Sequence, residues 1–249
     1  MPLEAPPDPI GLRVADLNRR YQHRSAFDVL DHALADPHVG RSALVSSFGA
    51  ESVVLLHMVS VIDRTTPILF IDTEMLFPET IDYQRDLAAR LELNVETVKP
   101  SRDQTFLRDG SNRLHQTDPD ACCALRKSEP LERALEPYEA WITGRKRYQG
   151  GQRVGLDLFE DEAGKRIKIN PLAHWGPEDL NDYITNNRLP RHPLVSKGYP
   201  SIGCAPCTTR VAPGEDPRAG RWRGFGKDEC GIHFDGNGKV VRADKDKAA

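Results

Sequence analysis

The strongest constraint on the fold is an alternation of strand-like and helix-like segments in the first hundred residues. Short apolar segments at 41–47, 66–72 and 94–100 have the character of strands, and residues 51–63 and 77–93 have helical spacing. Strands that run in the same direction need a helical crossover between them. The alternation therefore predicts an α/β fold, with a parallel sheet covered by helices on both faces.

Further elements are predicted on either side of this region. Residues 25–36, 118–138 and 176–188 have helical spacing, and residues 140–144 form another short strand-like segment. Beyond Pro190 the chain is rich in proline, glycine and charge, so the sequence predicts little regular structure there.

Three loops follow predicted strands: SSFGAES at 46–52, DTEMLFPET at 72–80 and TGRKRYQGG at 143–151. Ligands of open parallel sheets bind at the carboxyl ends of the strands, so these loops are expected to share one crevice. SSFGAES has the small residues of a phosphate-binding loop before a helix. It lacks the G-K-[ST] ending of a Walker A motif, and from its residues alone a plain strand–helix turn is slightly favoured.

Composition limits the class of protein. The formal charge of -3 over 249 residues argues against a general nucleic-acid-binding surface. The N-terminus has neither a basic leader nor an apolar core region, and no apolar stretch is long enough to span a membrane. We therefore expect a cytoplasmic protein without nucleic-acid or membrane partners. Its five cysteines should be reduced thiols, metal ligands or catalysts.

Four of the five cysteines form two pairs, the adjacent Cys122 and Cys123 and the C-x-x-C of Cys204 and Cys207. A C-x-x-C loop is a common chelating element. Adjacent residues on a helix diverge by roughly 100°, which suits a multi-iron cluster better than one small ion. From spacing alone, an iron–sulfur cluster, a zinc site and unrelated cysteine pairs have about equal weight.

The fifth cysteine, Cys230, lies in the glycine-rich stretch GKDECGIHFDG, close to His233. Glycines on both sides would let this cysteine move, as a nucleophile that must reach a substrate would need to. From its neighbours alone, a surface thiol without function is about equally favoured. Basic residues occur on loops or a helix near the predicted crevice, where together they would neutralise a phosphate–sulfate group: Arg126, Lys127, Arg145, Lys146, Arg218 and Arg221.

Taken together, CCALRK, CAPCTTRVAPGEDPRAGRWRG and ECGIH resemble the motifs of the assimilatory adenylyl-sulfate reductases, which belong to the wider phosphoadenylyl-sulfate reductase family. SSFGAES, FIDTEMLFPET and WITGRKR are similar to other motifs of that family, and the resemblance runs from about residue 41 to 235. It implies a Rossmann-like nucleotide α-hydrolase fold. It also implies thioredoxin-dependent reduction of adenosine 5′-phosphosulfate to sulfite and AMP, in sulfate assimilation and cysteine biosynthesis.

The resemblance places the functional residues of the family on this chain. Cys230 is the expected nucleophile, which would form an S-sulfocysteine, and a [4Fe–4S] cluster is expected on Cys122, Cys123, Cys204 and Cys207. With Arg145 and His233 added from their positions, the expected substrate-binding residues are Ser46, Ser47, Glu51, Lys127, Arg145, Arg218, Arg221 and His233. Glu74 stands where the family usually has glycine, and Ser52 where it often has aspartate.

The expected organisation has three parts: a lead-in and helix at 1–40, a nucleotide-binding domain with the iron–sulfur site at 41–210, and a mobile tail with the nucleophile at 211–249. The cluster is expected to position Lys127, four residues after Cys123 on the same helix face. A homo-oligomer is compatible with the sequence.

Three other functions remain as alternatives. A reductase of the 3′-phosphorylated substrate typically lacks the four cluster cysteines. An ATP-splitting sulfur-transfer enzyme of the same fold typically has an S-G-G-x-D-S loop, which is absent here. A non-catalytic iron–sulfur or zinc sensor of redox state would need no nucleotide and no Cys230.

Overall fold

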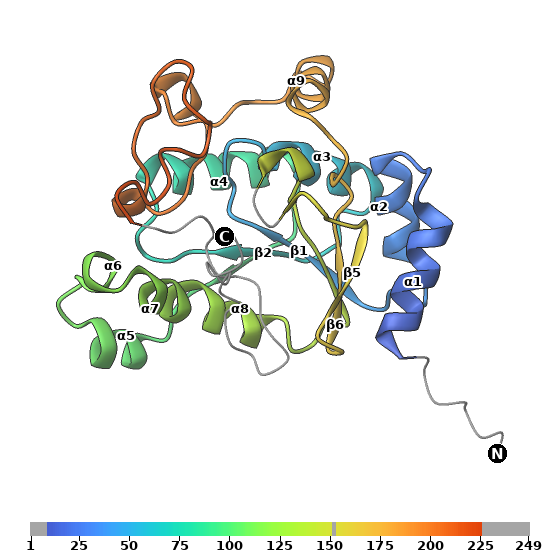
Figure 1. The fold of residues 1–249 in the computed structure, drawn as a ribbon, viewed down its shortest axis with the longest axis horizontal. Coiled ribbons are helices and arrows are strands. Elements are labelled where there is room, and N and C mark those ends of the chain that lie inside the picture. Colours follow the sequence, from blue (N-terminus) through green and yellow to red (C-terminus); the bar gives the residue numbers. More distant parts are fainter. Residues whose placement is uncertain (1–8, 151–152, 226–249) are drawn as a thin grey trace, which may run out of the picture.

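A computed structural model describes residues 9–150 and 153–225 and contains a six-stranded sheet in the order β3-β2-β1-β4-β6-β5. Five of the strands run parallel, and β5 pairs antiparallel with β6 at one edge (Figure 1). The predicted α/β fold is confirmed, with an antiparallel edge strand added. The strands are β1 (Ser42–Ser46), β2 (Ile68–Ile71), β3 (Val95–Val98), β4 (Ala140–Ile142), β5 (Phe159–Glu162) and β6 (Arg166–Ile169).

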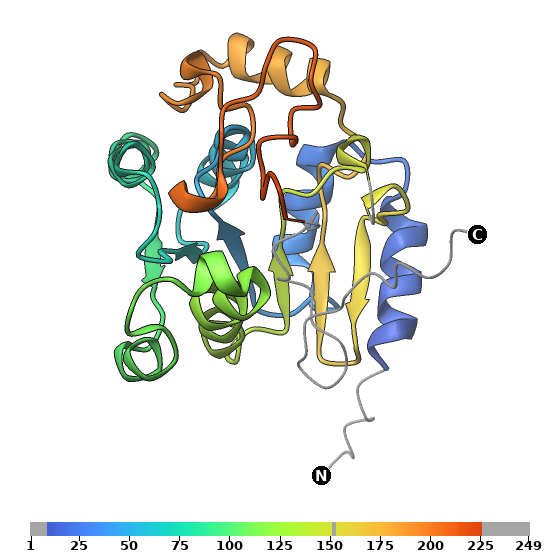
Figure 2. The same ribbon diagram turned by 60° about the vertical axis from the view of Figure 1, so that its left-hand side comes forward.

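Helices cover both faces of the sheet, as Figures 1 and 2 show from two directions. One face carries α1 (Ile10–Tyr21), α2 (Ala26–Ala35), α3 (Ser52–Ile62), α4 (Pro78–Leu91) and α9 (Pro177–Asn186). The other face carries α8 (Glu129–Ala134), with α5 (Arg102–Asp109), α6 (Leu114–Thr117) and α7 (Pro119–Cys123) near its end. Within the described ranges, every helix is too short or too polar to cross a bilayer.

The central strands are apolar on both sides because both of their faces are buried. In β2, Ile68 and Phe70 face the core under α3, whereas Leu69 and Ile71 face the core under α8. Helix α3 is buried on most of its circumference, which explains its nearly continuous apolar sequence. The sheet therefore forms a rigid platform between two apolar cores.

The predicted lead-in belongs to the same folded unit. Leu17 of α1 and Val29 of α2 lie in the core that the strands share with α3. Helix α2 begins at Ser25, whose hydroxyl accepts a hydrogen bond from the backbone N–H of Asp28. The side-chain amide of Asn18 in α1 donates to the carbonyl of Phe159 and accepts from its N–H. These two hydrogen bonds satisfy backbone groups that the edge strand β5 would otherwise leave unpaired.

The segment 118–138, predicted as one helix, is interrupted. It consists of α7, a π-helical turn at Ala124–Ser128 and α8. Pro130 lies in the first turn of α8 and has no N–H to donate to a carbonyl of the preceding turn. Its missing donor favours an irregular pattern of backbone hydrogen bonds in the helix at this point. Turns of this type concentrate at functional sites.

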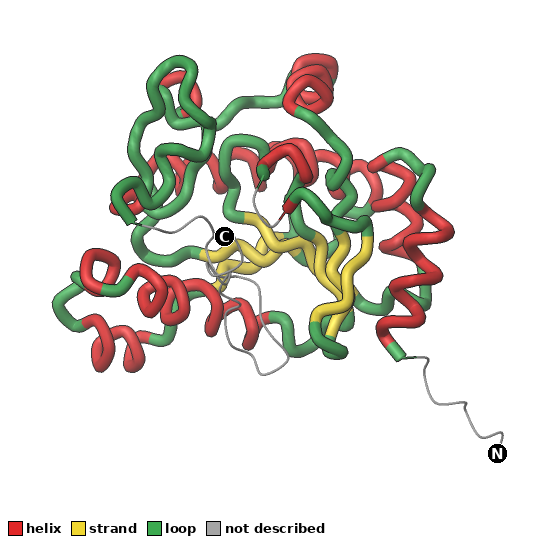
Figure 3. Tube along the Cα trace, viewed as in Figure 1, coloured by secondary structure: helices red, strands yellow, loops and turns green. Residues whose placement is uncertain are grey.

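The chain from Leu189 to Phe225 is mostly loop, as predicted, and Figure 3 shows it beside the ends of the strands. It contains two short 3-10 turns, Val195–Lys197 and Ala205–Cys207. It is nevertheless packed, because Trp222 is only 2% exposed. Residues 226–249, the rest of the predicted tail, lie outside the described residues.

Candidate active site

A cavity of about 480 Å³ opens at the carboxyl ends of β1 and β4. These strands are neighbours in the sheet, but the chain continues from β1 toward one edge and from β4 toward the other. Such a reversal leaves a crevice where ligands of α/β proteins bind. The three predicted loops meet here, and seven of the expected substrate-binding residues line the cavity: Ser46, Ser47, Glu51, Lys127, Arg145, Arg218 and Arg221.

The loop after β1 turns sharply at Phe48, which has a left-handed backbone with a φ of 49°. Its N–H donates to the hydroxyl of Ser46 at 3.1 Å. Its ring is fully buried and packs edge-on against Phe70, with 5.3 Å between centroids. This anchor holds the backbone of Ser47 and Gly49 at the cavity wall, just before the N-terminus of α3. Backbone amides and a helix N-terminus together favour a bound anion.

Glu51 lines the cavity as predicted, and its carboxylate is held by side chains of the loop after β4. Lys146 Nζ lies 2.7 Å from Oε2, Gln149 Nε2 lies 3.3 Å from Oε2, and the hydroxyl of Tyr148 donates to Oε1. Burial raises the pKa of Glu51, but Lys146 and Tyr148 lower it more, so the carboxyl stays ionised at neutral pH. Burial lowers the pKa of Lys146 and outweighs the opposite effect of Glu51.

Arg145 and Lys127 approach the cavity from different elements. Arg145 follows β4 and is ion-paired with Glu160, and its guanidinium also donates to Asn170 Oδ1 at 3.1 Å. Lys127 lies in the π-helical turn and is buried at the cavity wall. Burial raises the pKa of Cys207 to about 11, and the charge of Lys127 opposes this rise, so the ammonium acts on the cysteine loop through its field.

Arg221 connects the loop of residues 211–225 with the C-x-x-C loop. Its backbone forms a β-bridge with Thr208, and its guanidinium donates to the carbonyl of Ile202 at 3.1 Å. The guanidinium lies 4.4 Å from the ring centroid of Trp222 and directly against the backbone of Gly203. Arg221 thus reaches the cavity by crossing the residue that precedes Cys204.

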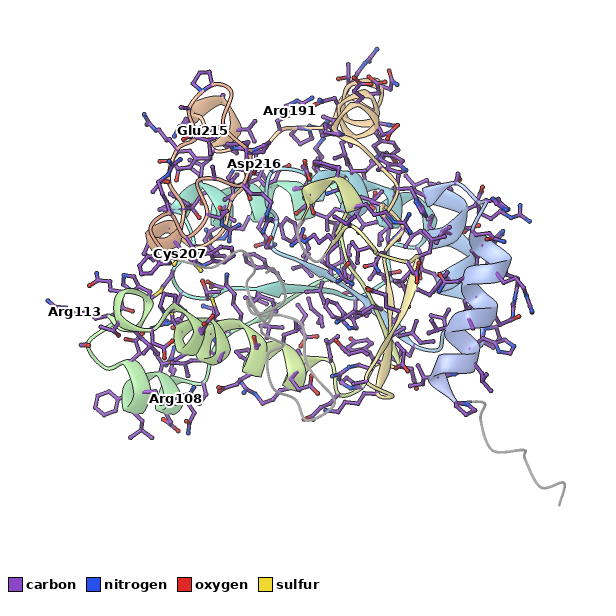
Figure 4. All side chains as sticks on the ribbon, viewed as in Figure 1. Arg108, Arg113, Arg191, Cys207, Glu215 and Asp216 are labelled. Atoms are coloured by element: carbon purple, nitrogen blue, oxygen red, sulfur yellow. The ribbon has the colours of Figure 1, made fainter. Side chains whose placement is uncertain are left out.

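Three of the four paired cysteines lie together beside the cavity, and the fourth, Cys123, is the buried chain neighbour of Cys122. Cys122 and Cys204 pack together with Met75, and Cys207 packs against them. The hydroxyl of Thr73 lies 3.2 Å from Cys204 Sγ. Burial, together with the charges of the other three thiols, raises the pKa of Cys122 to about 12. In Figure 4, Cys207 lies on the side of its loop that faces α6 and α7.

This donor set fits a thiolate-bound cluster. It consists of sulfur atoms alone, and as thiolates they would repel one another in a desolvated site, a repulsion that bound iron would relieve. Within residues 9–150 and 153–225, no group of three or more potential ligands surrounds the position of a single metal ion. The ligand set itself stays a prediction.

Arg126 was expected near the crevice, but its side chain does not line the cavity. Its guanidinium donates to Asp109 at 2.9 Å and to the carbonyl of Thr73, a cavity-lining residue, at 3.2 Å. Arg126 and Asp109 are both buried, so the pair joins α5 to the loop after β2. Lys127 faces the cavity because consecutive residues on a helix point in different directions.

Two predicted site residues, Cys230 and His233, lie outside the described residues. Several cavity-lining residues had not been identified from the sequence as site residues, among them Trp141, Tyr148, Gln149 and Arg153. Tyr148 and Gln149 belong to the TGRKRYQGG loop. The position of this loop directly after a predicted strand was the signal that could have identified them. Trp141 opens the WITGRKR motif, although a strand tryptophan by itself is typical of a core. Arg153 gave no signal, because a lone arginine is typical of a surface.

Comparisons with known proteins agree with this geometry. Residues 41–210 match the family model described as phosphoadenosine phosphosulfate reductase domain. A protein of Chelativorans sp. (strain BNC1) named adenosine 5′-phosphosulfate reductase is 48% identical over 238 residues, covering 94% of this chain and 97% of the relative. A protein of Mesorhizobium japonicum with the same name is 46% identical over 230 residues, covering 92% and 90%.

Among solved structures, the phosphoadenylyl-sulfate reductase of Candida auris in complex with phosphate matches with a TM-score of 0.67 and 30% sequence identity. The match covers 80% of this chain and 96% of the other. The family model spans the six strands, the loops after β1 and β4 and the four paired cysteines. The chain therefore belongs to the phosphoadenosine phosphosulfate reductase domain family.

Proposed function

We propose that this protein is an adenylyl-sulfate reductase, an oxidoreductase that converts adenosine 5′-phosphosulfate to sulfite and AMP with electrons from thioredoxin. The observation that carries the proposal is the joint lining of one cavity by the loop after β1 and by Lys127, Arg145, Arg218 and Arg221. The names of the two relatives, which align over most of the chain, specify the nucleotide.

The cavity has the parts that such a substrate needs. Apolar side chains such as Leu44 and Leu172 line the cavity together with the cationic groups. The cavity therefore offers apolar contacts for the base of a nucleotide and cationic contacts for its phosphate–sulfate group. The anchored backbone around Ser47 and the start of α3 would accept part of the negative charge. Lys127 and Arg221 would face the group that leaves, because both lie toward the cysteine loop.

The first chemical step is an in-line attack of the Cys230 thiolate on the sulfate sulfur. A bond forms between the cysteine sulfur and the sulfate sulfur, and the bond to the phosphate oxygen breaks with its electron pair, so AMP leaves. The cationic side chains at the cavity stabilise the charge that develops on the leaving phosphate. The product is an S-sulfonated Cys230.

The second step regenerates the thiol. A thiolate of reduced thioredoxin attacks the Cys230 sulfur, and sulfite leaves with the electron pair of the sulfur–sulfur bond. The resulting mixed disulfide is resolved by the second thioredoxin thiol, so the dithiol supplies both reducing equivalents. The reaction thus needs no electrons from a metal centre.

Cys122, Cys123, Cys204 and Cys207 would hold a [4Fe–4S] cluster, which when bound supplies a local field and a rigid link between their two loops. Lys127 and Arg221 would transmit such a link, since Lys127 lies in the turn that follows Cys123 and lines the cavity, and Arg221 crosses Gly203 beside Cys204 to reach it. We place the reaction in sulfate assimilation in the cytoplasm, with the product sulfite used in cysteine biosynthesis.

The test is a sulfite-release assay with thioredoxin, on anaerobically purified wild-type protein and on Cys230→Ser. We expect turnover of adenosine 5′-phosphosulfate by the wild type and none by the variant. Equal turnover by both proteins would refute the assigned nucleophile, and absence of turnover by a wild type with intact iron would refute the substrate.

The 3′-phosphorylated nucleotide is the second candidate substrate, favoured by the name of the Candida auris protein. The same assay decides between them. A kcat/KM that is higher for the 3′-phosphorylated nucleotide would reverse the assignment.

A further inference from the structure

A fully buried side-chain amide lies behind the wall of the cavity. It belongs to Asn170, which directly follows β6, is 0% exposed, and is not among the described residues that line the cavity. The parallel pairing of β4 with β6 continues to this point, because the N–H of Thr143 donates to the carbonyl of Ile169 at 2.8 Å. Thr143 and Asn170 are therefore neighbours where their two strands end.

The amide of Asn170 uses its full hydrogen-bonding capacity. Its Oδ1 accepts from the hydroxyl of Thr143 at 2.6 Å and from the guanidinium of Arg145 at 3.1 Å. Its Nδ2 donates to the carboxylate of Glu160 at 2.8 Å and to the carbonyl of Asp157 at 2.9 Å. A side-chain amide offers two donor hydrogens and two acceptor positions, so these four contacts hold Asn170 in one orientation.

Arg145 carries this network to the cavity, which its own side chain lines. Besides its contact with Asn170, its guanidinium is ion-paired with Glu160, and its Nε donates to the hydroxyl of Thr143 at 3.3 Å. Three side chains, from β5 and from the ends of β4 and β6, thus fix one cation at the cavity wall. An arginine that is fixed before its ligand arrives loses less conformational entropy when the ligand binds.

The antiparallel β5–β6 hairpin supplies much of this support. Glu160 lies in β5, and Asn170 follows β6. Neither is among the described residues that line the cavity, so both would affect a bound ligand through Arg145. The carboxylate of Glu160 also offsets the repulsion between Arg145 and the other cations of the cavity wall.

We propose that Asn170 is a positioning residue for nucleotide binding: together with Glu160, it holds Arg145 in the orientation in which the guanidinium binds the phosphate–sulfate group. This role rests on the proposed function, from which the nucleotide is taken. A fixed cation contacts the anion in the bound substrate as well as in the transition state. Loss of Asn170 should therefore raise KM more than it lowers kcat.

Isothermal titration calorimetry in the Cys230→Ser background, which lacks the proposed nucleophile, tests this role by binding alone. Asn170→Ala should raise the Kd for adenosine 5′-phosphosulfate about tenfold, because a displaced Arg145 loses a hydrogen bond to an anion. Affinity for adenosine, which has no anionic group, should stay unchanged. Asn18→Ala is the matched control, since its amide also makes two hydrogen bonds to β5, at Phe159, and it should change neither Kd.

The double variant Asn170→Ala/Arg145→Ala shows whether Asn170 acts through Arg145. Its Kd for the phosphosulfate should equal that of Arg145→Ala alone. If Asn170→Ala does not fold, Glu160→Gln tests the same support, because the side chain of Glu160 is 31% exposed and its replacement disturbs the core less. Glu160→Gln should also weaken binding of the phosphosulfate and leave that of adenosine unchanged.

Equal losses of affinity for adenosine and the phosphosulfate would overturn the proposal. Additive losses in the double variant would also overturn it, as would an unchanged Kd in both Asn170→Ala and Glu160→Gln. A wild type that binds the phosphosulfate and releases no sulfite would refute the proposed reaction, and the Kd values would still decide the role of Asn170. A wild type that does not bind this nucleotide would refute both.

Discussion

Replacing Gly203 by alanine should weaken substrate turnover far more than it weakens the fold. A Cβ at Gly203 would lie 2.2 Å from Arg221 Nη2 and 2.5 Å from its Cζ, so both cannot occupy their places. The clash is with the far end of a flexible side chain, and Arg221 can therefore swing away. The backbone of the C-x-x-C loop should stay where it is.

The size of the effect follows from what Arg221 loses. Its displacement breaks the hydrogen bond to the carbonyl of Ile202 and removes one cation from the cavity. A hydrogen bond from Arg221 to the anionic substrate would contribute about 1.5–3 kcal/mol, so its loss should lower kcat/KM roughly 10- to 100-fold. The free energy of unfolding should fall by only about 1 kcal/mol, at the low end for overpacking.

Steady-state kinetics of Gly203→Ala, Arg221→Ala and the double variant test this reasoning. If Gly203 acts through Arg221, the double variant should be no slower than Arg221→Ala alone. Gly155→Ala is the control, because a Cβ there meets no atom within 4 Å. Additive losses in the double variant, or unchanged kcat/KM in Gly203→Ala, would refute the account.

Three further predictions follow from single residues. Lys127→Ala should lower kcat/KM by about 100-fold while iron content stays unchanged, because Lys127 is a buried cation of the cavity wall and is not a cysteine ligand; full activity would contradict this. Glu74 has a left-handed backbone with a φ of 59°, so Glu74→Gly should raise the free energy of unfolding by about 0.5–1 kcal/mol, measured by urea titration; a decrease would contradict the strain. His192 is buried against Thr80, and burial lowers its pKa to about 4. Between pH 6.5 and 4 the unfolded chain therefore binds a proton that the folded chain does not, and stability should fall by about 2 kcal/mol from pH 7 to pH 5. His192→Asn should flatten this dependence, and an unchanged slope would rule His192 out as its source.

The parallel part of the sheet and the cavity at its edge could be predicted because each depends on patterns within short stretches of the sequence. The alternation of apolar strands and helices identified β1 to β4, and the loops at their carboxyl ends met where parallel topology requires. The structure also explains why the family usually has glycine where this chain has Glu74. The backbone at this position is left-handed, and glycine adopts that conformation without strain.

The parts that sequence reasoning missed depended on contacts between distant segments. The β5–β6 hairpin alternates apolar residues with charges that resemble a solvent-facing surface, yet Glu162, Arg166 and Lys168 are buried. Arg126 and Lys127 are adjacent and both basic, and only the helix geometry separates the one that braces Asp109 from the one at the cavity. Helix α1 follows a proline-rich start and became recognisable only through its packing in the core.

The most direct test of the central claim is the intact mass of anaerobically purified protein after addition of adenosine 5′-phosphosulfate without a reductant. The account predicts a single sulfonate adduct that thioredoxin removes and that Cys230→Ser does not form. A protein with its iron intact that forms no adduct with this nucleotide or with its 3′-phosphorylated form would contradict it.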